Sequence, residues 1–324
     1  GLWRLLWLPP ALPYYQVEGA FAEAQSQELT KRLVFSSWRV VPKVIAGVLS
    51  YEAEREMMQS FEPEAQNTLE ARKRRRGLLR IAREGDGLRL AGMPVLGLMY
   101  PSLGMVDDFD PLGLARECGA NGGLPTLDAV LARATEKARG VLLRLVGEFG
   151  EKVEAPAGGA ADENWYWAAP ILIDVLRHGG DVRTWLSDEE TPDWWAGEDS
   201  EEEDGDGGAS VWSLHVAKAV ELLDRHLKLG RPPDDLAEAT ALLGLAGPGV
   251  VAARSLARAG SGVDAIDGSE LRDAAAPAAW AVRNLFNLPE TMAVVRGLDR
   301  REPYWRRVLE YCAAGGFQAV LDEY

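Results

Sequence analysis

The densest group of residues that could bind a ligand is a basic cluster formed by Arg72, Lys73, Arg74, Arg75 and Arg76. Arginine presents forked N–H donors that match the oxygens of a phosphate group. Clustered cations also gain affinity for polyanions by releasing the counterions of a phosphate backbone. The cluster is therefore a candidate polyanion site. A solvated helix end explains it equally well, because such runs are common on protein surfaces.

An acidic segment carries the opposite charge. Eleven Asp and Glu residues and no base lie between Asp188 and Asp206, within a chain of formal net charge −15. Because so many like charges cannot pack together, we expect a solvated, disordered loop over residues 188–208. Its spacing does not match a calcium-binding loop. The adjacent indoles of Trp194 and Trp195 are the exception, since they need burial or a partner.

Common catalytic signatures are absent from the sequence. It contains no GxxxxGK[ST] phosphate loop, no GxGxxG after a strand, no GxSxG and no HExxH. His215 and His226 would lie about 16 Å apart on one helix face at 1.5 Å per residue, so they cannot hold one metal. An enzyme that uses the paired carboxylates Asp107 and Asp108 stays an alternative without a partner residue. The sequence therefore predicts no catalytic residue and no metal site.

Cysteine content and hydropathy bear on the compartment. With only Cys118 and Cys312, a disulfide framework and a cysteine-rich zinc site are excluded, which favours the cytoplasm. No apolar run reaches the roughly 18 residues of a membrane span. The start, GLWRLLWLPP, lacks a basic region and is interrupted by two prolines, so it does not predict a signal peptide. Eleven tryptophans are present, and we expect most to be core, including Trp165, Trp167, Trp212 and Trp280.

The first 60 residues predict a connector and the opening of an α/β unit. A helix is expected around Phe21–Thr30, followed by a buried strand over Lys31–Trp38, whose run Leu33-Val34-Phe35 suits a strand covered on both faces. The next segment has Pro42 in a first helical turn and apolar residues at helical spacing, including Val44 and Val48.

Residues 61–150 predict the basic cluster, a β-hairpin and a helix. Apolar runs on both sides of Glu84–Gly87 indicate a hairpin that ends in a longer strand through Tyr100. Residues 105–123 read as a loop, and Thr126 is expected to cap a long amphipathic helix.

Residues 151–324 predict a helical region that contains the acidic loop. The expected helices are Trp165–His178, Val211–Leu229, Leu236–Leu243, Gly249–Ala259, Ala274–Asn287, Pro289–Gly297 and Glu302–Ala313. No period of 20–50 residues recurs, which argues against a solenoid.

Several blocks resemble a known family: GLWRLLWLPPALPYY, KRLVFSSWRVVPKVIAGVLSYEAE, GMPVLGLMYPS, LFNLPE and YWRRVLEYCAAGGFQAVLDEY. They are similar to large bacterial superfamily-two helicases related to the Swi/Snf type, often found near DNA-processing or phage-defence genes. In that group the LVFSSW segment opens the second RecA-like motor lobe, and a long helical insertion follows. The resemblance implies an α/β fragment of a RecA-like helicase lobe with a large, mainly α-helical insertion.

The same resemblance implies an ATP-dependent motor that is incomplete here. The family's phosphate loop and acidic metal-binding motif would precede Gly1, and its arginine motif would follow Tyr324. The chain starts with Gly rather than Met and ends inside an expected helix, so we expect a piece of a longer protein. ATP and Mg²⁺ would serve the intact protein, and this fragment alone would bind neither and would not hydrolyse ATP.

By the resemblance, Ser36, Ser37, Trp38 and Lys43 lie near the nucleic-acid backbone, where hydroxyls and amides contact phosphates. Core packing is the alternative for Trp38 and is the favoured reading for Phe35. The partner would be DNA, double-stranded by expectation, with other defence or DNA-processing proteins as further partners and no membrane. The rival hypothesis is a non-enzymatic helical scaffold that binds a protein through its Trp-rich and acidic surface. The insertion, about Phe61 to Tyr304, would brace the lobe, grip the duplex or dock another subunit.

Overall fold

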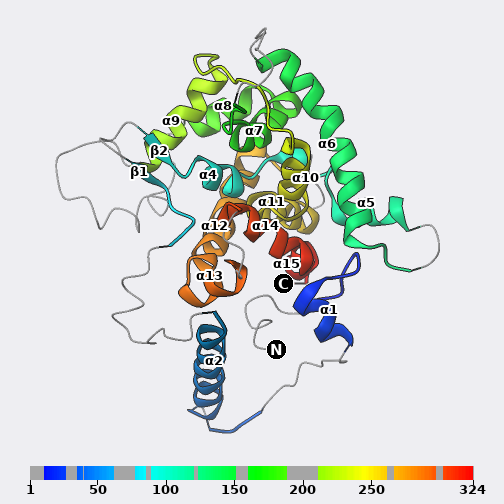
Figure 1. Cartoon of the computed structure of the whole chain (residues 1–324), viewed down its shortest axis with the longest axis vertical. Helices are drawn as coiled ribbons and strands as arrows, with labels where there is room; N and C mark the ends of the chain where they lie inside the picture. The colour runs from blue at the N-terminus through cyan, green and yellow to red at the C-terminus, as the bar shows by residue number, and fades with distance from the viewer. Residues whose placement is uncertain are drawn as a thin grey trace, which may run out of the picture.

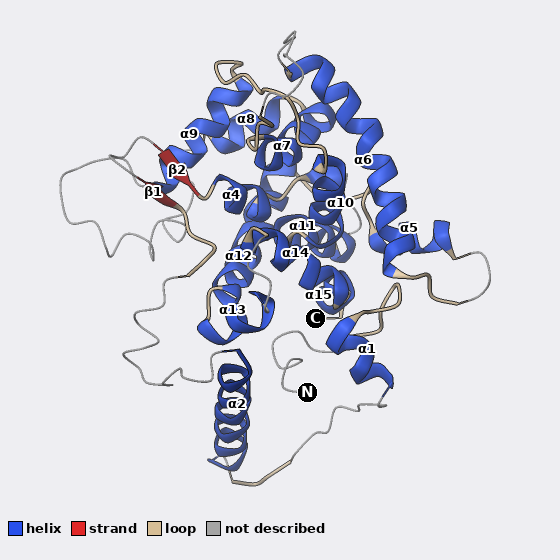
Figure 2. Ribbon diagram, in the orientation of Figure 1, coloured by secondary structure: helices blue, strands red, loops and turns tan. Residues whose placement is uncertain are grey.

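The fold is mostly helical. The computed structural model describes residues 11–26, 35–38, 40–61, 77–84, 89–119, 123–150, 160–187, 211–260, 266–296 and 302–323. Within these ranges the strands are confined to one two-stranded hairpin. Figures 1 and 2 show the helices gathered into one body, from which helix α2 (Val40–Phe61) projects. The prediction of a largely helical region is confirmed, whereas the α/β lobe is not seen among the described residues.

The helices of the body are short to medium in length. Their bounds are α1 (Gly19–Ser26), α4 (Met93–Met99), the 3₁₀ turn η2 (Leu103–Met105), α5 (Pro111–Cys118), α6 (Leu127–Phe149), α7 (Trp165–His178), α8 (Gly180–Leu186), α9 (Val211–Leu223), α10 (Leu236–Ala246), α11 (Pro248–Ala259), α12 (Gly268–Phe286), α13 (Pro289–Arg296), α14 (Tyr304–Ala314) and α15 (Phe317–Asp322).

The hairpin lies where the sequence predicts it. Strand β1 (Ala82–Glu84) pairs antiparallel with β2 (Arg89–Ala91). The expected longer strand through Tyr100 is wrong, because Gly92 ends β2 with a φ of 114° and α4 follows. A Cβ at Gly92 would lie 2.2 Å from the carbonyl oxygen of Arg80, so no other residue fits this turn.

Helix α6 is confirmed, including its start. The Oγ1 of Thr126 accepts a hydrogen bond from the N–H of Ala129 at 3.2 Å, which caps the first turn. The apolar side of the helix is buried as expected, and α6 packs along α10. Figure 1 shows α6 at the edge of the body, so its opposite side faces solvent.

Helix α7 crosses the centre of the body with two fully buried tryptophans, Trp165 and Trp167. The sequence predicted both the bounds of α7 and the burial of these indoles. Helix α4 reaches α7 through a glycine: a Cβ at Gly97 would lie 2.8 Å from the Cα of Trp167. The two backbones therefore approach more closely than any larger residue at position 97 would allow.

A buried ion pair links α7 to α12. The Asp174 carboxylate accepts hydrogen bonds from the Nε and Nη2 of Arg272, at 3.2 and 3.0 Å, and both side chains are fully buried. The same carboxylate accepts from the Tyr100 hydroxyl at 2.7 Å and from the N–H of Gly104 at 2.8 Å. The Trp185 ring lies against both the Arg272 guanidinium and the Tyr100 ring. Burial and the Asp174 charge raise the Tyr100 pKa, so its phenol stays protonated as a donor.

The two ends of the described chain meet on α14 and α15. The Tyr15 hydroxyl, on a buried side chain, donates to the carbonyl oxygen of Ala313 at 2.7 Å. The Phe21 ring packs edge-on against Tyr311, with 5.3 Å between ring centroids. A single apolar core extends from Tyr15 to Val320, so the first helix and the last belong to one packed unit.

Other differences from the expected helices have local causes. The region read as a loop over 105–123 contains α5, whose N-cap Asp110 accepts hydrogen bonds from the N–H groups of Leu112 and Gly113. Helix α9 ends before the expected Leu229, close to Arg225 with its positive φ of 60°. Helix α12 starts earlier than expected because Asp267 caps it.

No single helix among the described residues combines the length and the apolar composition of a membrane span. The bent pair α10 and α11 passes on length and composition together, and most of its residues are buried within the body.

We expect Asp174→Ala to lower the free energy of unfolding by about 3–5 kcal/mol, because it leaves Arg272 as an uncompensated buried charge. Urea unfolding measures the loss. Asp234→Ala is the matched control, since Asp234 pairs with Arg231 on the surface at 87% side-chain exposure and should cost less than about 1 kcal/mol. Equal losses in the two variants would contradict a central role for the buried pair.

Candidate nucleic-acid interface

The predicted backbone-contacting residues lie at the exposed start of α2. Ser36, Ser37 and Lys43 are exposed, and the Trp38 side chain is 68% exposed. Phe35 is 87% exposed, so the expectation that it packs in a core is wrong in this structure. Residues 35–38 form a bend rather than the end of a strand. The physical reason is that no sheet lies opposite them among the described residues, and residues 31–34 of the predicted strand lie outside that part of the chain.

Helix α2 confirms the helix expected after Pro42, yet its composition is unusual for its surroundings. Every residue from Pro42 to Leu49 is exposed, and the large apolar side chains among them point to more than one side of the helix. Across the first half of α2, the large apolar side chains that are at least half exposed are Val40, Val44, Val48, Leu49 and Tyr51. A helix that is apolar all round is normally enclosed by protein. This part of α2 therefore has the composition of a buried helix and the exposure of a surface one.

The far half of α2 anchors the helix to the body. Helix α2 packs against α13, and Ala53 is buried there at 4% exposure. In the same half, Arg55 is paired with Glu52 and Glu56. Figure 1 shows the N-terminal half pointing away from the body. The C-terminal half of α2 thus attaches the helix to the body, and the N-terminal half with Trp38 stays exposed.

The turn that leads into α2 is ordered by hydrogen bonds. The Ser36 Oγ accepts from the N–H of Trp38 at 3.1 Å, and the Trp38 carbonyl oxygen accepts from the N–H of Val41 at 3.2 Å. Ser36 thereby sets the local backbone, in addition to the phosphate contact that the resemblance implies for its hydroxyl.

The basic cluster Arg72, Lys73, Arg74, Arg75 and Arg76 lies outside the described residues, as do the acidic segment 188–208, Trp194 and Trp195. The structure therefore brings together Ser36, Ser37, Trp38 and Lys43 and gives no position for the arginines relative to them.

The described residues contain no group of three or more His, Cys, Asp or Glu side chains that could hold a metal. Asp108, one of the paired carboxylates, forms an ion pair with Arg177. His226 is exposed and His215 is buried, which agrees with the structural and surface roles expected for histidine.

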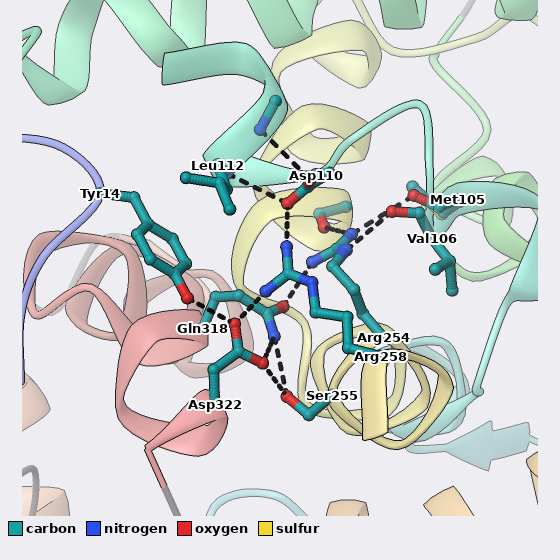
Figure 3. A network of polar contacts seen from close by, with 12 residues as sticks. Tyr14, Met105, Val106, Asp110, Leu112, Arg254, Ser255, Arg258, Gln318 and Asp322 are labelled. Atoms are coloured by element: carbon teal, nitrogen blue, oxygen red, sulfur yellow. Dashed lines mark hydrogen bonds and ion pairs between the residues drawn. The ribbon is translucent and has the colours of Figure 1, made fainter. Parts of the chain in front are cut away.

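The sequence reasoning missed a buried cation. The Arg254 guanidinium is 1% exposed, and neutral oxygens surround it. Its Nε donates to the Val106 carbonyl oxygen at 2.7 Å, its Nη1 to the Gln318 side chain at 2.6 Å, and its Nη2 to the carbonyl oxygens of Gly244 at 2.7 Å and Met105 at 3.3 Å (Figure 3). Burial lowers the Arg254 pKa to about 10, which leaves the group charged at neutral pH.

A second cation, Arg258, lies one turn further along α11 and brings two carboxylates close to Arg254. Arg258 pairs with both Asp110 and Asp322 (Figure 3). Asp322 also accepts from Ser255 and from the Tyr14 hydroxyl. Burial, and after it the bond to Asp322, raises the Tyr14 pKa to about 12. The network joins the N-terminal segment, α5, α11 and α15, and its role is structural.

A sequence signal for these interior charges exists. Arg254 falls on the apolar side of α11 at helical spacing from Val250, Val251 and Ala257, and all of these residues are buried. Asp174 interrupts the apolar run of α7 in the same way. A charge on the apolar side of a helix implies a buried partner, although the sequence does not say which one.

His215 is the buried titratable group that a pH change tests most directly. Its Nδ1 lies 2.7 Å from the Val211 carbonyl oxygen, and its Nε2 lies 3.0 Å from the Ala91 carbonyl oxygen on β2. Burial lowers the His215 pKa and outweighs both of these bonds, which raise it. The neighbouring Lys218 lowers it further. The imidazole is therefore neutral in the folded protein at pH 7.

We expect the protein to lose stability as the pH falls below about 6.5, because unfolded chains bind the His215 proton first. Above that pH the stabilisation is fully present. His215→Gln should flatten this part of the stability curve, by at most about 1.4 kcal/mol per pH unit. Thermal melts between about pH 5.5 and 7.5 measure the difference. His226→Gln, at an exposed position, should leave the wild-type slope unchanged. Parallel slopes for wild type and His215→Gln would contradict this assignment.

Comparisons with known proteins give no relative for this chain. No protein-family model, no curated protein and no solved structure matches it. Its function is therefore inferred from the residues and their geometry.

Proposed function

We propose that this chain is part of the motor region of an ATP-dependent DNA helicase or translocase. Residues 31–60 would open the second RecA-like lobe, and the helical body would be the insertion within that lobe. The proposal starts from the resemblance of the segment Lys31–Arg55 to large bacterial superfamily-two helicases.

The observation that carries the proposal is the exposure of α2. Its apolar first half follows the segment LVFSSW, and its side chains lack cover on more than one side. In an α/β lobe, the first helix packs on a parallel sheet and against neighbouring helices, which covers such a surface. Further strands of a motor lobe would cover Val44 and Val48.

The polar residues beside α2 fit a phosphate backbone. Ser36, Ser37 and Lys43 supply hydroxyl and ammonium donors on an exposed turn. The cluster from Arg72 to Arg76 would add charge, since twenty residues separate it from the end of the exposed segment at Tyr51. Both groups contact phosphates without reading a base sequence, which suits an enzyme that moves along DNA.

The chain's own residues do not complete an ATP site. The sequence has no phosphate loop, so ATP and Mg²⁺ would be bound by other parts of the motor, as the resemblance implies. We therefore assign no step of hydrolysis to this chain. Its part in the mechanism is to carry nucleic-acid contacts on a lobe that moves relative to the other lobe.

A second candidate function is a non-enzymatic helical scaffold. The same exposed apolar surface of α2 favours it, since contiguous apolar patches mark protein–protein contacts. The two candidates differ in salt dependence, because an apolar interface does not weaken with added salt as a phosphate interface does.

We expect the chain to bind a short DNA duplex with an affinity that falls steeply between about 50 and 200 mM salt. Replacement of Arg74 and Arg75 by Glu should weaken binding and reduce the salt slope, since each lost phosphate contact lowers that slope by about 0.9. Arg231→Glu, on the body surface, is the control for net charge. Unchanged affinity in the Arg74/Arg75 variant would remove the basic cluster from the interface.

We also expect the purified chain to show no ATP hydrolysis above background, with or without DNA, because it lacks the phosphate loop. A phosphate-release assay on the chain as it stands measures this. Turnover that persists in a highly purified sample would show that the chain contains an ATP site of another kind.

A further inference from the structure

We propose that Phe35 and Trp38 form a base-stacking platform for single-stranded nucleic acid at the N-terminal end of α2. The inference rests on the proposed nucleic-acid function and adds the kind of strand that is bound. Phe35 and Trp38 are called the aromatic pair below.

The exposure of the aromatic pair sets it apart from the other aromatic side chains. Among the described residues, the aromatic side chains that stand out as exposed are Phe35, Trp38 and Tyr51. All three belong to the segment 35–51. Trp165 and Trp167, by contrast, are fully buried and donate their indole N–H groups to the Gly230 carbonyl oxygen and the Asn164 side chain. Among the described residues, aromatic side chains of the body are therefore buried or partly buried, and the most exposed ones lie at the start of α2.

The platform is held in place rather than carried on a free tail. The bond from the Trp38 N–H to the Ser36 Oγ closes a turn, and the Trp38 carbonyl oxygen accepts from Val41 in the first turn of α2. The helix is 22 residues long and is anchored at α13 by its far half. The backbone turn that carries Trp38 is therefore ordered before a base stacks on the ring, which lowers the entropic cost of binding.

The charge of the segment complements a phosphate backbone. Residues 35–51 contain two of the 35 Lys and Arg residues of the chain and none of its 50 Asp and Glu residues. The chain as a whole carries a formal net charge of −15. Much of this negative charge is concentrated between Asp188 and Asp206, which holds eleven Asp and Glu residues and no base. A nucleic acid meets no acidic side chain of the segment 35–51, where Lys43 and the hydroxyls of Ser36 and Ser37 can contact phosphates.

The chemistry selects a single strand. Bases in a duplex are already stacked and paired, so their faces are closed to a protein ring, whereas an unpaired base offers its π-face. Two aromatic rings three positions apart, with hydroxyls between them and a lysine beyond, match the combination of stacking surface and backbone contacts found in proteins that bind single strands without sequence preference. The expectation of double-stranded DNA would then apply to the basic cluster, and the aromatic pair would hold a separated strand.

The test compares three labelled probes by fluorescence anisotropy with the full chain: a thymidine oligonucleotide of about 20 nucleotides, an abasic strand of equal length and charge, and a duplex of the same length. Trp38→Ala should weaken binding of the thymidine strand about 5- to 150-fold, the range for loss of one stacked base. Binding of the abasic strand and the duplex should change less than about 2-fold. Trp38→Phe should restore most of the affinity, because it keeps a ring.

Two controls separate stacking from charge and from folding. Leu143→Ala removes another exposed apolar side chain, on α6 at 76% exposure, and should leave all three affinities unchanged. The loss in Trp38→Ala should be the same at about 50 and 200 mM salt, since stacking releases no counterions, whereas Lys43→Ala should lose its effect at the higher salt. Because both side chains are exposed, the melting temperatures of these variants should stay close to that of the wild type.

Three results would overturn the platform. Equal weakening of the thymidine and abasic strands would show that Trp38 acts on the backbone. Unchanged binding in Trp38→Ala, accompanied by a lower mass in sedimentation, would identify the aromatic pair as a protein contact. In both cases the proposed function survives. Failure of the wild-type chain to bind any of the three probes would remove the proposed nucleic-acid function together with the platform.

Discussion

The architecture of the body depends on one buried cation. A guanidinium that is buried away from water needs hydrogen-bond acceptors in the protein to replace the lost water molecules. For Arg254 these acceptors lie on η2, α10 and α15 and at Val106. Each acceptor is a carbonyl or amide oxygen whose position is set by its own helix. These acceptors therefore constrain where η2, α10 and α15 lie relative to α11, and Arg258 extends the constraint to the partly buried carboxylates of Asp110 and Asp322 (Figure 3). Apolar packing fills the body, whereas these bonds fix its geometry.

The sequence predicts the helices of this protein better than it predicts their arrangement. The bounds of α7, the Thr126 cap of α6 and the hairpin turn follow from local signals, namely apolar spacing, capping residues and Gly. The link between Asp174 and Arg272 spans 98 residues, and that between Arg254 and Val106 spans 148. Such pairs are chosen by the folded arrangement, so a single sequence indicates only that a buried charge needs a partner. The helix of Met93–Met99 was mistaken for a strand because short apolar runs fit both periods.

The candidate interface also shows that a single sequence does not predict which residues come into contact. Its helix was predicted from Pro42 and the apolar spacing, but the burial of Phe35 was not borne out, since burial is decided by what lies opposite a side chain. An apolar run indicates that its side chains are to be buried. It does not indicate whether they are buried against the body, against another part of a motor lobe or against a ligand. The Ser36 bond to Trp38 could not be foreseen either, because a serine in a bend has several backbone partners within reach.

The meeting of the two chain ends has a consequence for synthesis. Tyr15 and its acceptor Ala313 are 298 residues apart, and a similar length of chain separates Phe21 from Tyr311. At about 5–20 residues per second, a ribosome would take roughly 15–60 seconds to supply the second partner after the first. During this interval the N-terminal segment has an apolar surface with no native position to occupy. Closure of residues 11–26 onto α14 and α15 must therefore wait until those two helices have been synthesised, and a chain that stops short of residue 304 never completes it.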